Sequence, residues 1–320
     1  MSAYDVLCVG SATVDRFLTI EQSLSSIALG DKVLVTSSEI HSGGGASNAA
    51  AALSKLGLQA RMLTKLGNDH DAEFILKEMK QYNVRNLCRH HSRKSTDFST
   101  IISSTQEKDR IIFVHKGASA DLLNYDYSMA QVAASRWIYM ATLVGKSFST
   151  AKQIASFAAR KKIKLLFNPS LYLAKKGKAL RPLLRAATVL VLNKEEAEVL
   201  LGTTIYPLKK MALALHALGP EIVVITDGPN KVVAYADNVL YSFQPPQVKV
   251  VHTAGAGDAF TAGFLVGIIK KYPLEDALRL GQVNALSVIQ HIGTKNKLLT
   301  AREAAKLSAR YKIRVHQDEI

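Results

Sequence analysis

The sequence predicts an α/β fold, in which a doubly wound, mostly parallel sheet is flanked by helices, and two patterns indicate this class. In the second half of the chain, short apolar runs alternate with longer amphipathic stretches, as at 137–141, 148–162 and 165–168. Strands that alternate with helices of about ten or more residues form βαβ units and a parallel sheet. The second pattern is the apolar run 5–9, which ends on Gly10 and is typical of a buried strand that leads into a turn.

Four further segments predict a small sheet that lies apart from the main one. They are strand-like, several have a polar face, and no helices are interleaved with them: 16–20, 32–40, 98–104 and 110–115. Half-polar alternation suits an antiparallel sheet with one face in water. Because the segments come from two separate regions, we expect a β lid, built from about 16–40 and 98–116, on a single domain that spans residues 1–320.

The remaining elements are expected between these landmarks. Helices are predicted at 45–56, 69–82, 194–201 and 209–218, in a stretch that ends near 186, and from 255, 274 and 300 onward. Strands are predicted at 61–66, 189–192 and 222–226, with a hairpin at 232–235 and 239–243 and a strand-like run at 248–251. Gly57 closes the first helix, as glycine commonly does.

The composition is that of an ordinary globular protein with an excess of basic residues. The chain has 320 residues, of which 48% are hydrophobic and 21% charged, and 41 Lys and Arg against 26 Asp and Glu give a net charge of +15. A basic protein attracts polyanions, including nucleic acid and nucleotides. The basic residues are scattered, however, and no aromatic–basic motif or zinc-ligand spacing accompanies them, so a nucleic-acid partner is not favoured.

The cysteines and the apolar runs bear on the location of the protein. Cys8 and Cys88 are the only cysteines, too few for a disulfide framework, and Cys8 lies in an apolar run that predicts a core position. The start of the chain does not have the pattern of a signal peptide, and no run approaches the ~20 apolar residues of a membrane helix. We therefore expect a cytoplasmic protein that does not enter a membrane.

The strongest chemical motif is a glycine-rich turn with an acidic residue, Thr253-Ala254-Gly255-Ala256-Gly257-Asp258-Ala259-Phe260. A helix-forming stretch follows it, and the free N–H groups at a helix start bind anions. A carboxylate in that first turn would lie beside the anion and can accept a proton from an attacking hydroxyl. Taken alone, the motif is equally compatible with an ordinary glycine-rich loop in which Asp258 is only a charge at a helix start.

Two weaker motifs lie nearer the start of the chain. The run 42–51 places three glycines before an alanine-rich helix, and its Asn48 offers donors and an acceptor that suit sugar hydroxyls. Asp15 follows the end of the first strand, where open α/β sheets place their ligands. Each also has a simpler interpretation, as a tight turn with a capping Asn48 and as a turn residue at Asp15.

The order of four motifs resembles the PfkB or ribokinase-like carbohydrate and nucleoside kinases. The motifs are 10–15, 43–48, 193–196 and 255–258, and the resemblance runs from about residue 5 to 295, with Gly-Ala-Gly-Asp followed by Ala-Phe as its specific part. It implies a doubly wound domain with a β lid that often also mediates dimerisation. It also implies ATP as phosphoryl donor, Mg²⁺, and a homodimer formed through the lid.

The resemblance implies roles for individual residues of the acceptor site. Asp258 matches the catalytic base, and the anion hole matches Ala254, Gly255, Ala256 and Gly257. Positions that hold substrate hydroxyls match Asp15, Gly44 and Asn48. Three further substrate positions depart from ribokinase, because Thr13, Gly45 and Thr142 stand where ribokinase has Asn, Lys and Glu. These departures argue against plain ribose as the substrate.

On the nucleotide side, the resemblance implies a second set of residues. Asn193 and Glu196 match a motif associated with magnesium and phosphate, and Glu196 would hold Mg²⁺ largely through water. The nucleotide would lie beside Thr226, Gly228 and Gly293, with adenine between the last helices. His252 stands where many relatives have an Asp that helps to bind a monovalent cation, so activation by potassium is expected to be weak or absent.

The sequence therefore predicts an ATP-dependent kinase that phosphorylates a hydroxymethyl group of a small sugar or sugar derivative. A nucleoside kinase of the same family is the alternative within enzymes, since both share these motifs. A non-catalytic module that senses sugar or nucleotide is the alternative outside them, because fold alone does not fix function. Basic residues of the lid, Arg16, Arg110 and Lys116, are more simply surface residues than a phosphate site for a phosphorylated sugar.

Overall fold

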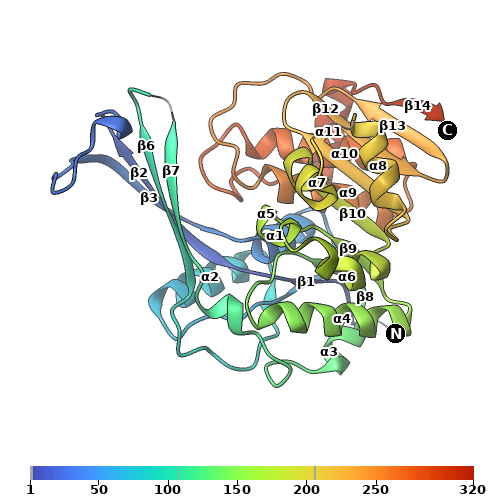
Figure 1. Ribbon diagram of the computed structural model, residues 1–320, viewed down its shortest axis with the longest axis horizontal. Coiled ribbons are helices and arrows are strands. Elements are labelled where there is room, and N and C mark those ends of the chain that lie inside the picture. The colour runs from blue at the N-terminus through green and yellow to red at the C-terminus, as the bar shows by residue number, and fades with distance from the viewer. Residues whose placement is uncertain (1–2, 108, 205–206) are drawn as a thin grey trace.

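The computed structural model describes residues 3–107, 109–204 and 207–320, and a large sheet forms its centre (Figure 1). Within these residues its strand order is β14-β13-β12-β11-β10-β9-β8-β1-β4-β5. The strands are β1 Tyr4–Val9, β4 Ala60–Leu63, β5 Arg85–Asn86, β8 Ser135–Met140, β9 Lys164–Phe167, β10 Val189–Asn193, β11 Ile222–Asp227, β12 Lys231–Ala236, β13 Val239–Phe243 and β14 His316–Glu319. Neighbours from β5 to β11 pair in parallel, and β12 to β14 continue the sheet antiparallel.

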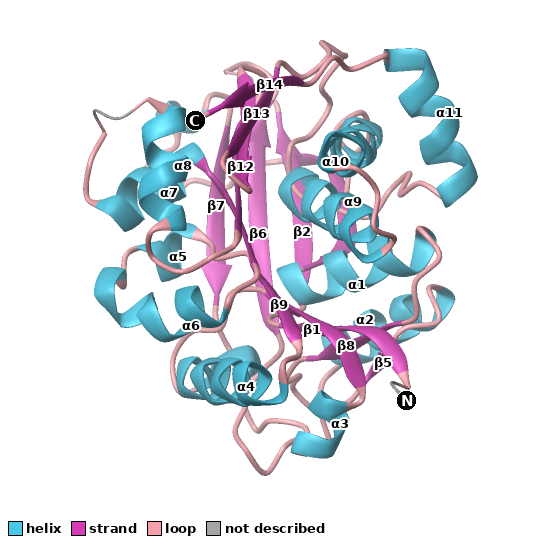
Figure 2. Cartoon of the chain, turned by 90° about the vertical axis from the view of Figure 1, so that its right-hand side faces the viewer, coloured by secondary structure: helices cyan, strands magenta, loops and turns pink. Residues whose placement is uncertain are grey.

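Helices cover both faces of this sheet, and each face has its own apolar core (Figure 2). One core includes α1 Gly45–Lys55, α2 His70–Gln81, α9 Ala256–Ile269, α10 Leu274–Val288 and α11 Ala301–Tyr311. The other includes α3 Met129–Ala133, α4 Ser147–Lys161, α5 Leu171–Ala174, α6 Arg181–Ala186, α7 Lys194–Leu201 and α8 Leu208–His216. The prediction of a doubly wound, mostly parallel sheet is confirmed, and Cys8 is fully buried in β1.

The four half-polar segments form a second sheet that projects from the main body (Figure 1). Its order is β3-β2-β6-β7, with β2 Thr13–Ile20, β3 Val35–Gly43, β6 Asp97–Ser104 and β7 Arg110–His115. The expectation of a purely antiparallel sheet is wrong, because β2 and β6 run parallel. Both strands leave the main body in the same direction and each returns as a hairpin, so the two hairpins meet side by side in parallel.

Other differences from the sequence prediction have local causes. Residues 248–251 form no strand, and the N–H of Val251 instead donates to the backbone oxygen of Ile289, just after α10, at 2.8 Å. The helical stretch that ends at residue 186 is broken into α5, a 3₁₀ turn at Gly177–Leu180 and α6. Strand β14 was not predicted because it is entirely polar and exposed, and it joins the sheet through its backbone pairing with β13.

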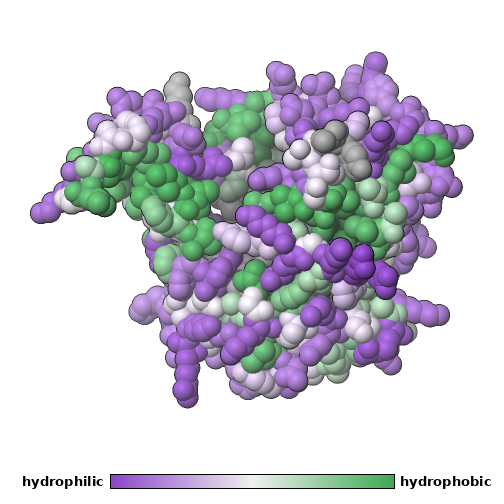
Figure 3. Space-filling view, in the orientation of Figure 1, coloured by the Kyte–Doolittle hydropathy of each residue, from purple (hydrophilic) through white to green (hydrophobic). Residues whose placement is uncertain are grey.

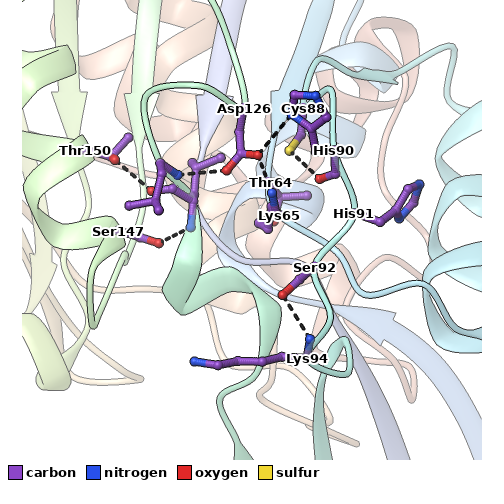
Figure 4. A network of polar contacts seen from close by, with 12 residues as sticks. Thr64, Lys65, Cys88, His90, His91, Ser92, Lys94, Asp126, Ser147 and Thr150 are labelled. Carbon is purple, nitrogen blue, oxygen red and sulfur yellow. Dashed lines mark hydrogen bonds and ion pairs between the residues drawn. The ribbon is translucent and has the colours of Figure 1, made fainter.

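A buried ion pair anchors the segment that leads into the lid (Figure 4). Nζ of Lys65, which follows β4, donates to the fully buried carboxylate of Asp126, whose other oxygen accepts from the Leu123 N–H at 2.9 Å. His90 lies in the connection from β5 to β6, and its Nδ1 is 3.4 Å from Asp126. The network thereby ties the approach to β6 to the main body.

No helix in the described part of the chain has both the length and the apolar character needed to cross a membrane.

Candidate active site

A cavity of about 410 Å³ lies where the carboxyl ends of the central strands face the second sheet. Open α/β sheets bind ligands at this edge. Strands β1, β8, β9, β10 and β11 each contribute the residues that follow or end them: Ser11, Ala141, Thr142, Asn168, Asn193 and Thr226. The second sheet closes the other side with Thr13, Asp15, Ser99, Val114 and Lys116.

Of the residues singled out from the sequence, the cavity brings together members of all four motifs. From the motifs these are Thr13, Asp15, Gly44, Gly45, Asn48, Asn193, Glu196, Gly255, Gly257 and Asp258, and Thr142 and Thr226 line the cavity with them. Ala254, Ala256, Gly228 and Gly293 do not line it. Ala256 is the first residue of α9, and its N–H donates to the backbone oxygen of Thr253 at 3.3 Å, whereas Gly293 packs against His41 of β3.

Helix α1 begins in contact with the end of β1 because of Gly44. This residue has φ +93°, and a Cβ there would lie 2.6 Å from the backbone oxygen of Ser11. A non-glycine residue would therefore be strained both in its backbone and in its contacts. The close approach places Asn48 in the first turn of α1, with a buried side chain at the cavity wall.

Helix α9 begins in a similar way and presents Asp258. Gly255 has φ +80°, and a Cβ there would lie 2.6 Å from the backbone oxygen of Thr294. Asp258 follows in the first turn, and its Oδ2 accepts a hydrogen bond of 2.8 Å from Asn48 Nδ2. Burial raises the pKa of Asp258 to about 6, against the opposing effects of Asn48 and the charge of Lys295. Gly255, Gly257 and Asp258 of this turn line the cavity, and the N–H groups of a first helical turn have no partner within the helix.

The second sheet supplies another buried carboxylate. Asp15 on β2 is 9% exposed, and its Oδ1 accepts from Thr13 Oγ1 at 3.2 Å. Burial raises its pKa, while hydrogen bonds from Ser99 and Thr13 and the charges of Lys295 and Lys116 lower it. Hydroxyls and carboxylates thus form this end of the cavity, where they can bind hydroxyl groups of a ligand.

At the opposite end, Asn193 and Glu196 are linked in a capping box at the start of α7. The Glu196 N–H donates to Asn193 Oδ1 at 2.8 Å, and the Asn193 N–H donates to Glu196 Oε2 at 2.9 Å. Burial raises the pKa of Glu196 to about 7. One oxygen of each side chain is used within the box, and Glu196 Oε1 is left to bind water or a cation.

Sequence reasoning missed two residues that hold this site together. Thr294 Oγ1 donates to Asn48 Oδ1 at 2.8 Å, and the ammonium of Lys295, which is 4% exposed, donates to the same oxygen at 3.2 Å. No local pattern separates the buried Lys295 from the exposed Lys297 two residues later. Among the basic lid residues, Arg16 does not line the cavity, and its Nη2 donates to both carboxylate oxygens of Asp71 at 2.7 and 2.8 Å.

Solved structures identify the class of fold. The chain superimposes on Arabidopsis thaliana ribokinase complexed with ribose and ATP with a TM-score of 0.81 and 21% identity, over 96% of this chain and 99% of the other. For the nucleoside kinase of Methanocaldococcus jannaschii the TM-score is 0.79 and the identity 19%, over 97% and 99% of the two chains. The architecture is the ribokinase fold.

Sequence comparison identifies the family. Ribokinase of Bacillus subtilis strain 168 is 27% identical over 318 residues, which cover 95% of this chain and 99% of that protein. Mouse (Mus musculus) ribokinase is 28% identical over 262 residues, 79% of this chain and 80% of that protein. A family model described as pfkB family carbohydrate kinase matches residues 3–301. The chain therefore belongs to the pfkB family of carbohydrate kinases, and it is a phosphotransferase with an alcohol group as acceptor.

The imidazole of His252 gives a prediction about monovalent cations. Its Nδ1 accepts from the Ala254 N–H at 3.2 Å, and its ring packs edge-on against Phe17 of the lid at 4.9 Å between centroids. Burial, Arg110 and His41 lower its pKa, so the ring is neutral at pH 7 and supplies no negative charge. We expect the rate to change little when potassium replaces a large organic cation at constant ionic strength, in a steady-state assay of ADP release.

The matched variant is His252→Asp, which places a carboxylate beside the turn that precedes α9. Because a carboxylate attracts a monovalent cation, this variant should respond to potassium more strongly than the parent protein. A parent rate that rises many-fold with potassium would contradict the prediction.

Proposed function

We propose that this protein is an ATP-dependent kinase that phosphorylates a hydroxymethyl group of a small sugar or sugar derivative. The observation that carries the proposal is the position of Asp258. Its carboxylate lies in the first turn of α9, one oxygen is held by Asn48, and the cavity separates hydroxyl-binding residues from the Asn193–Glu196 pair. A base between an acceptor site and an anion site is what phosphoryl transfer to an alcohol requires.

The character of the acceptor end favours a sugar over a nucleoside. Ser11, Thr13, Asp15, Ser99 and Thr142 offer small polar groups that match a polyol. A nucleobase would need a flat apolar or aromatic surface to pack on. Among the described residues that line the cavity, Tyr172 is the single aromatic one, and it is 56% exposed at the rim.

The opposite end fits a magnesium nucleotide. Carboxylate and amide oxygens are the ligands that magnesium prefers, and it usually keeps several waters. Glu196 has one oxygen free of the capping box, which fits an ion held largely through water, and the described residues include no group of three or more Asp, Glu, His or Cys side chains placed to hold a metal ion directly. Bound with ATP, the ion would neutralise phosphate charge, while Asn193, Thr226 and the backbone of Gly255–Asp258 orient the phosphates.

The proposed mechanism uses the residues of this chain in a fixed order. The acceptor binds with its hydroxyls on Asp15, Thr13 and Thr142, and the lid sheet closes over it and excludes water. Asp258 Oδ1 takes the proton as the hydroxyl oxygen attacks the γ-phosphorus and the bond to the β-phosphate oxygen breaks. The N–H groups of the first turn of α9 stabilise the charge on the transferred group, and ADP leaves.

Replacement of Asp258 by Asn should lower kcat at least ~10²-fold, the lower end of general-base effects, because Asn cannot accept the proton. The measurement is ADP release from ATP and Mg²⁺ across ribose, fructose, phosphosugars, 2-keto-3-deoxy acids, adenosine, inosine and cytidine. The control is Asp237→Asn at an exposed hairpin residue whose φ of +50° Asn tolerates.

Each result of this panel has a defined meaning. Activity with sugars supports the proposal, and activity confined to nucleosides replaces it by the nucleoside kinase. Near-normal turnover in Asp258→Asn removes Asp258 from the role of base. ATP binding without ADP release for any compound of the panel favours a sensing module.

The raised pKa of Asp258 predicts the pH dependence of the reaction. The base must be ionised, so kcat should be constant above pH ~7 and fall about tenfold per unit below the pKa of about 6. The test is kcat at saturating ATP and acceptor between pH 5 and 9. A profile that stays flat down to pH 5 would contradict an essential carboxylate with this pKa.

We also propose that two copies associate through the lid. Strand alternation places Val114, Ser99 and Asp15 toward the cavity, so Phe113, Ile111 and Ile40 face outward, and these three are 57%, 44% and 53% exposed. Figure 3 shows hydrophobic side chains gathered on the projecting sheet. Exposed apolar patches of this kind are typical of interaction sites.

Phe113→Asp should therefore convert a dimer to a monomer in sedimentation velocity, because it places a charge in the apolar contact. The control is Tyr272→Asp, at a residue that is 46% exposed after α9. A parent protein that sediments at 34.8 kDa, or a Phe113→Asp variant that stays dimeric, rejects the lid as the interface.

A further inference from the structure

A buried lysine lies behind the proposed catalytic carboxylate. Lys295 follows α10 in the turn that begins at Gly293, and its side chain is almost fully shielded from water. Its Nζ donates to the backbone oxygen of Ser42 at 2.6 Å and to Asn48 Oδ1 at 3.2 Å, and lies 4.0 Å from Glu78 Oε2. A buried ammonium is costly unless it is paired, so these contacts account for its presence in the interior.

The orientation of the Asn48 side-chain amide depends on this lysine. Its Oδ1 accepts from Thr294 and from Lys295, and its Nδ2 donates to Asp258 Oδ2. An amide has one accepting and one donating end. A cation at the oxygen end therefore turns the NH₂ group toward Asp258, and the reversed amide would set its oxygen against the carboxylate.

The other oxygen of Asp258 lies on the cavity side. A Cβ at Gly45 would come within 3.7 Å of Asp258 Oδ1, and Gly45 lines the cavity. With Oδ2 occupied by Asn48, Oδ1 is the oxygen that faces the acceptor.

We propose that Lys295 is a positioning residue for phosphoryl transfer, which orients Asn48 so that Asp258 is held in its ionised form with Oδ1 toward the acceptor. The inference rests on the proposed role of Asp258 as base. Lys295 itself is separated from the acceptor by Asn48, and it acts through the hydrogen bond that Asn48 makes.

The charges around Asp258 make Lys295 important to its ionisation. Titratable groups that act on it come from β1, β2, β8, α7 and the turn after α10: Cys8, Asp15, Tyr139, Glu196 and Lys295. Lys295 is the cation in this set, and Asp15 opposes it by raising the pKa of Asp258. Burial lowers the pKa of Lys295, while Glu78, Asp15 and Asp258 support its charged form.

The first test measures the pKa of the Asp258 carboxyl directly and needs no acceptor. The full chain is labelled with ¹³Cγ-aspartate, and the Asp258 signal is assigned by its loss in Asp258→Asn. In Lys295→Met the pKa of Asp258 should rise by about one unit, because the loss of a nearby opposite charge favours the neutral carboxyl. Lys306→Met, at an exposed position of α11, is the matched control and should leave it unchanged. An Asp258 titration unchanged by Lys295→Met overturns the inference.

The second test uses the acceptor from the panel that gives the highest Asp258-dependent rate. In the profile of kcat against pH, Lys295→Met should shift the acid limb to higher pH by about one unit. It should also lower the maximum kcat about tenfold or more, since misplacement of a catalytic group is costly. KM for ATP should stay within about threefold, because uniform binding is not affected. In an Asn48→Ala background, Lys295→Met should cost less than about threefold of the plateau, since coupled residues are not additive.

Charge-conserving and hydrogen-bonding variants separate this role from a structural one. Lys295→Arg should keep the acid limb near that of the parent protein, and Lys295→Gln should raise it like Lys295→Met. These two variants also decide the question if Lys295→Met fails to unfold cooperatively. If the acid limb of the kcat–pH profile is unshifted in Lys295→Gln while Asp258→Asn is inactive, the role of Lys295 is rejected and Asp258 is kept as base. An active Asp258→Asn instead removes Asp258 from the role of base, on which the inference rests.

Discussion

The hydrogen bond between Asn48 and Asp258 joins the starts of two helices that lie 210 residues apart in sequence. Helix α1 can begin where it does because Gly44 passes over the end of β1, and α9 because Gly255 passes over Thr294. Both turns need a backbone conformation that side chains rarely adopt, so the glycines set the distance between the two helix ends. The amide and the carboxylate then meet over the carboxyl edge of the sheet, where the remaining site residues already converge.

Three partly or fully buried carboxyls lie at this edge of the sheet, so the ionisation of each depends on burial and on the charges nearby. Burial raises the pKa values of Asp15, Glu196 and Asp258, and the ammonium groups of Lys295 and Lys116 lower that of Asp15. An anionic nucleotide must approach the same region. The net charge of +15 gives the molecule as a whole an attractive field for such a ligand.

Much of this architecture could be predicted from the sequence because its signals are local. Strand ends followed by glycine or by a polar residue indicate where α/β sheets place ligands, and Asp15 and Asn193 stand at such points. Asn48 and Asp258 have a different local signal, because each lies at a helix start that follows glycines. The lengths of the apolar runs distinguished the strands of the main sheet from its helices. The same reasoning placed the segments of the lid, since their alternation differs from that of a sheet buried on both faces.

Other features depend on contacts between distant segments and have no local signal. Lys295 is followed by Asn296 and Lys297 in a run that looks like surface, yet it is buried against residues 42 and 48 of another region. The parallel pairing of β2 and β6 follows from the path of the chain between them. Strand β14 has no apolar alternation, because its hydrogen bonds to β13 rather than its side chains hold it in place.

The lid sheet is connected to the main body at the wall of the cavity, and this has a mechanical consequence. Residues 10–12 lead directly from β1 into β2, and Gly44 leads from β3 into α1, so both connections lie at the cavity wall. Strand β2 extends for 8 residues, roughly 26 Å at about 3.3 Å per residue. A rotation of the sheet by about 10° about these connections would therefore move its far end by roughly 4.5 Å for this length of strand. Such a rotation would move Thr13 and Asp15, which lie close to the connections, far less than the tip of the sheet, so the entrance to the cavity would widen or narrow while these two residues stay nearly in place.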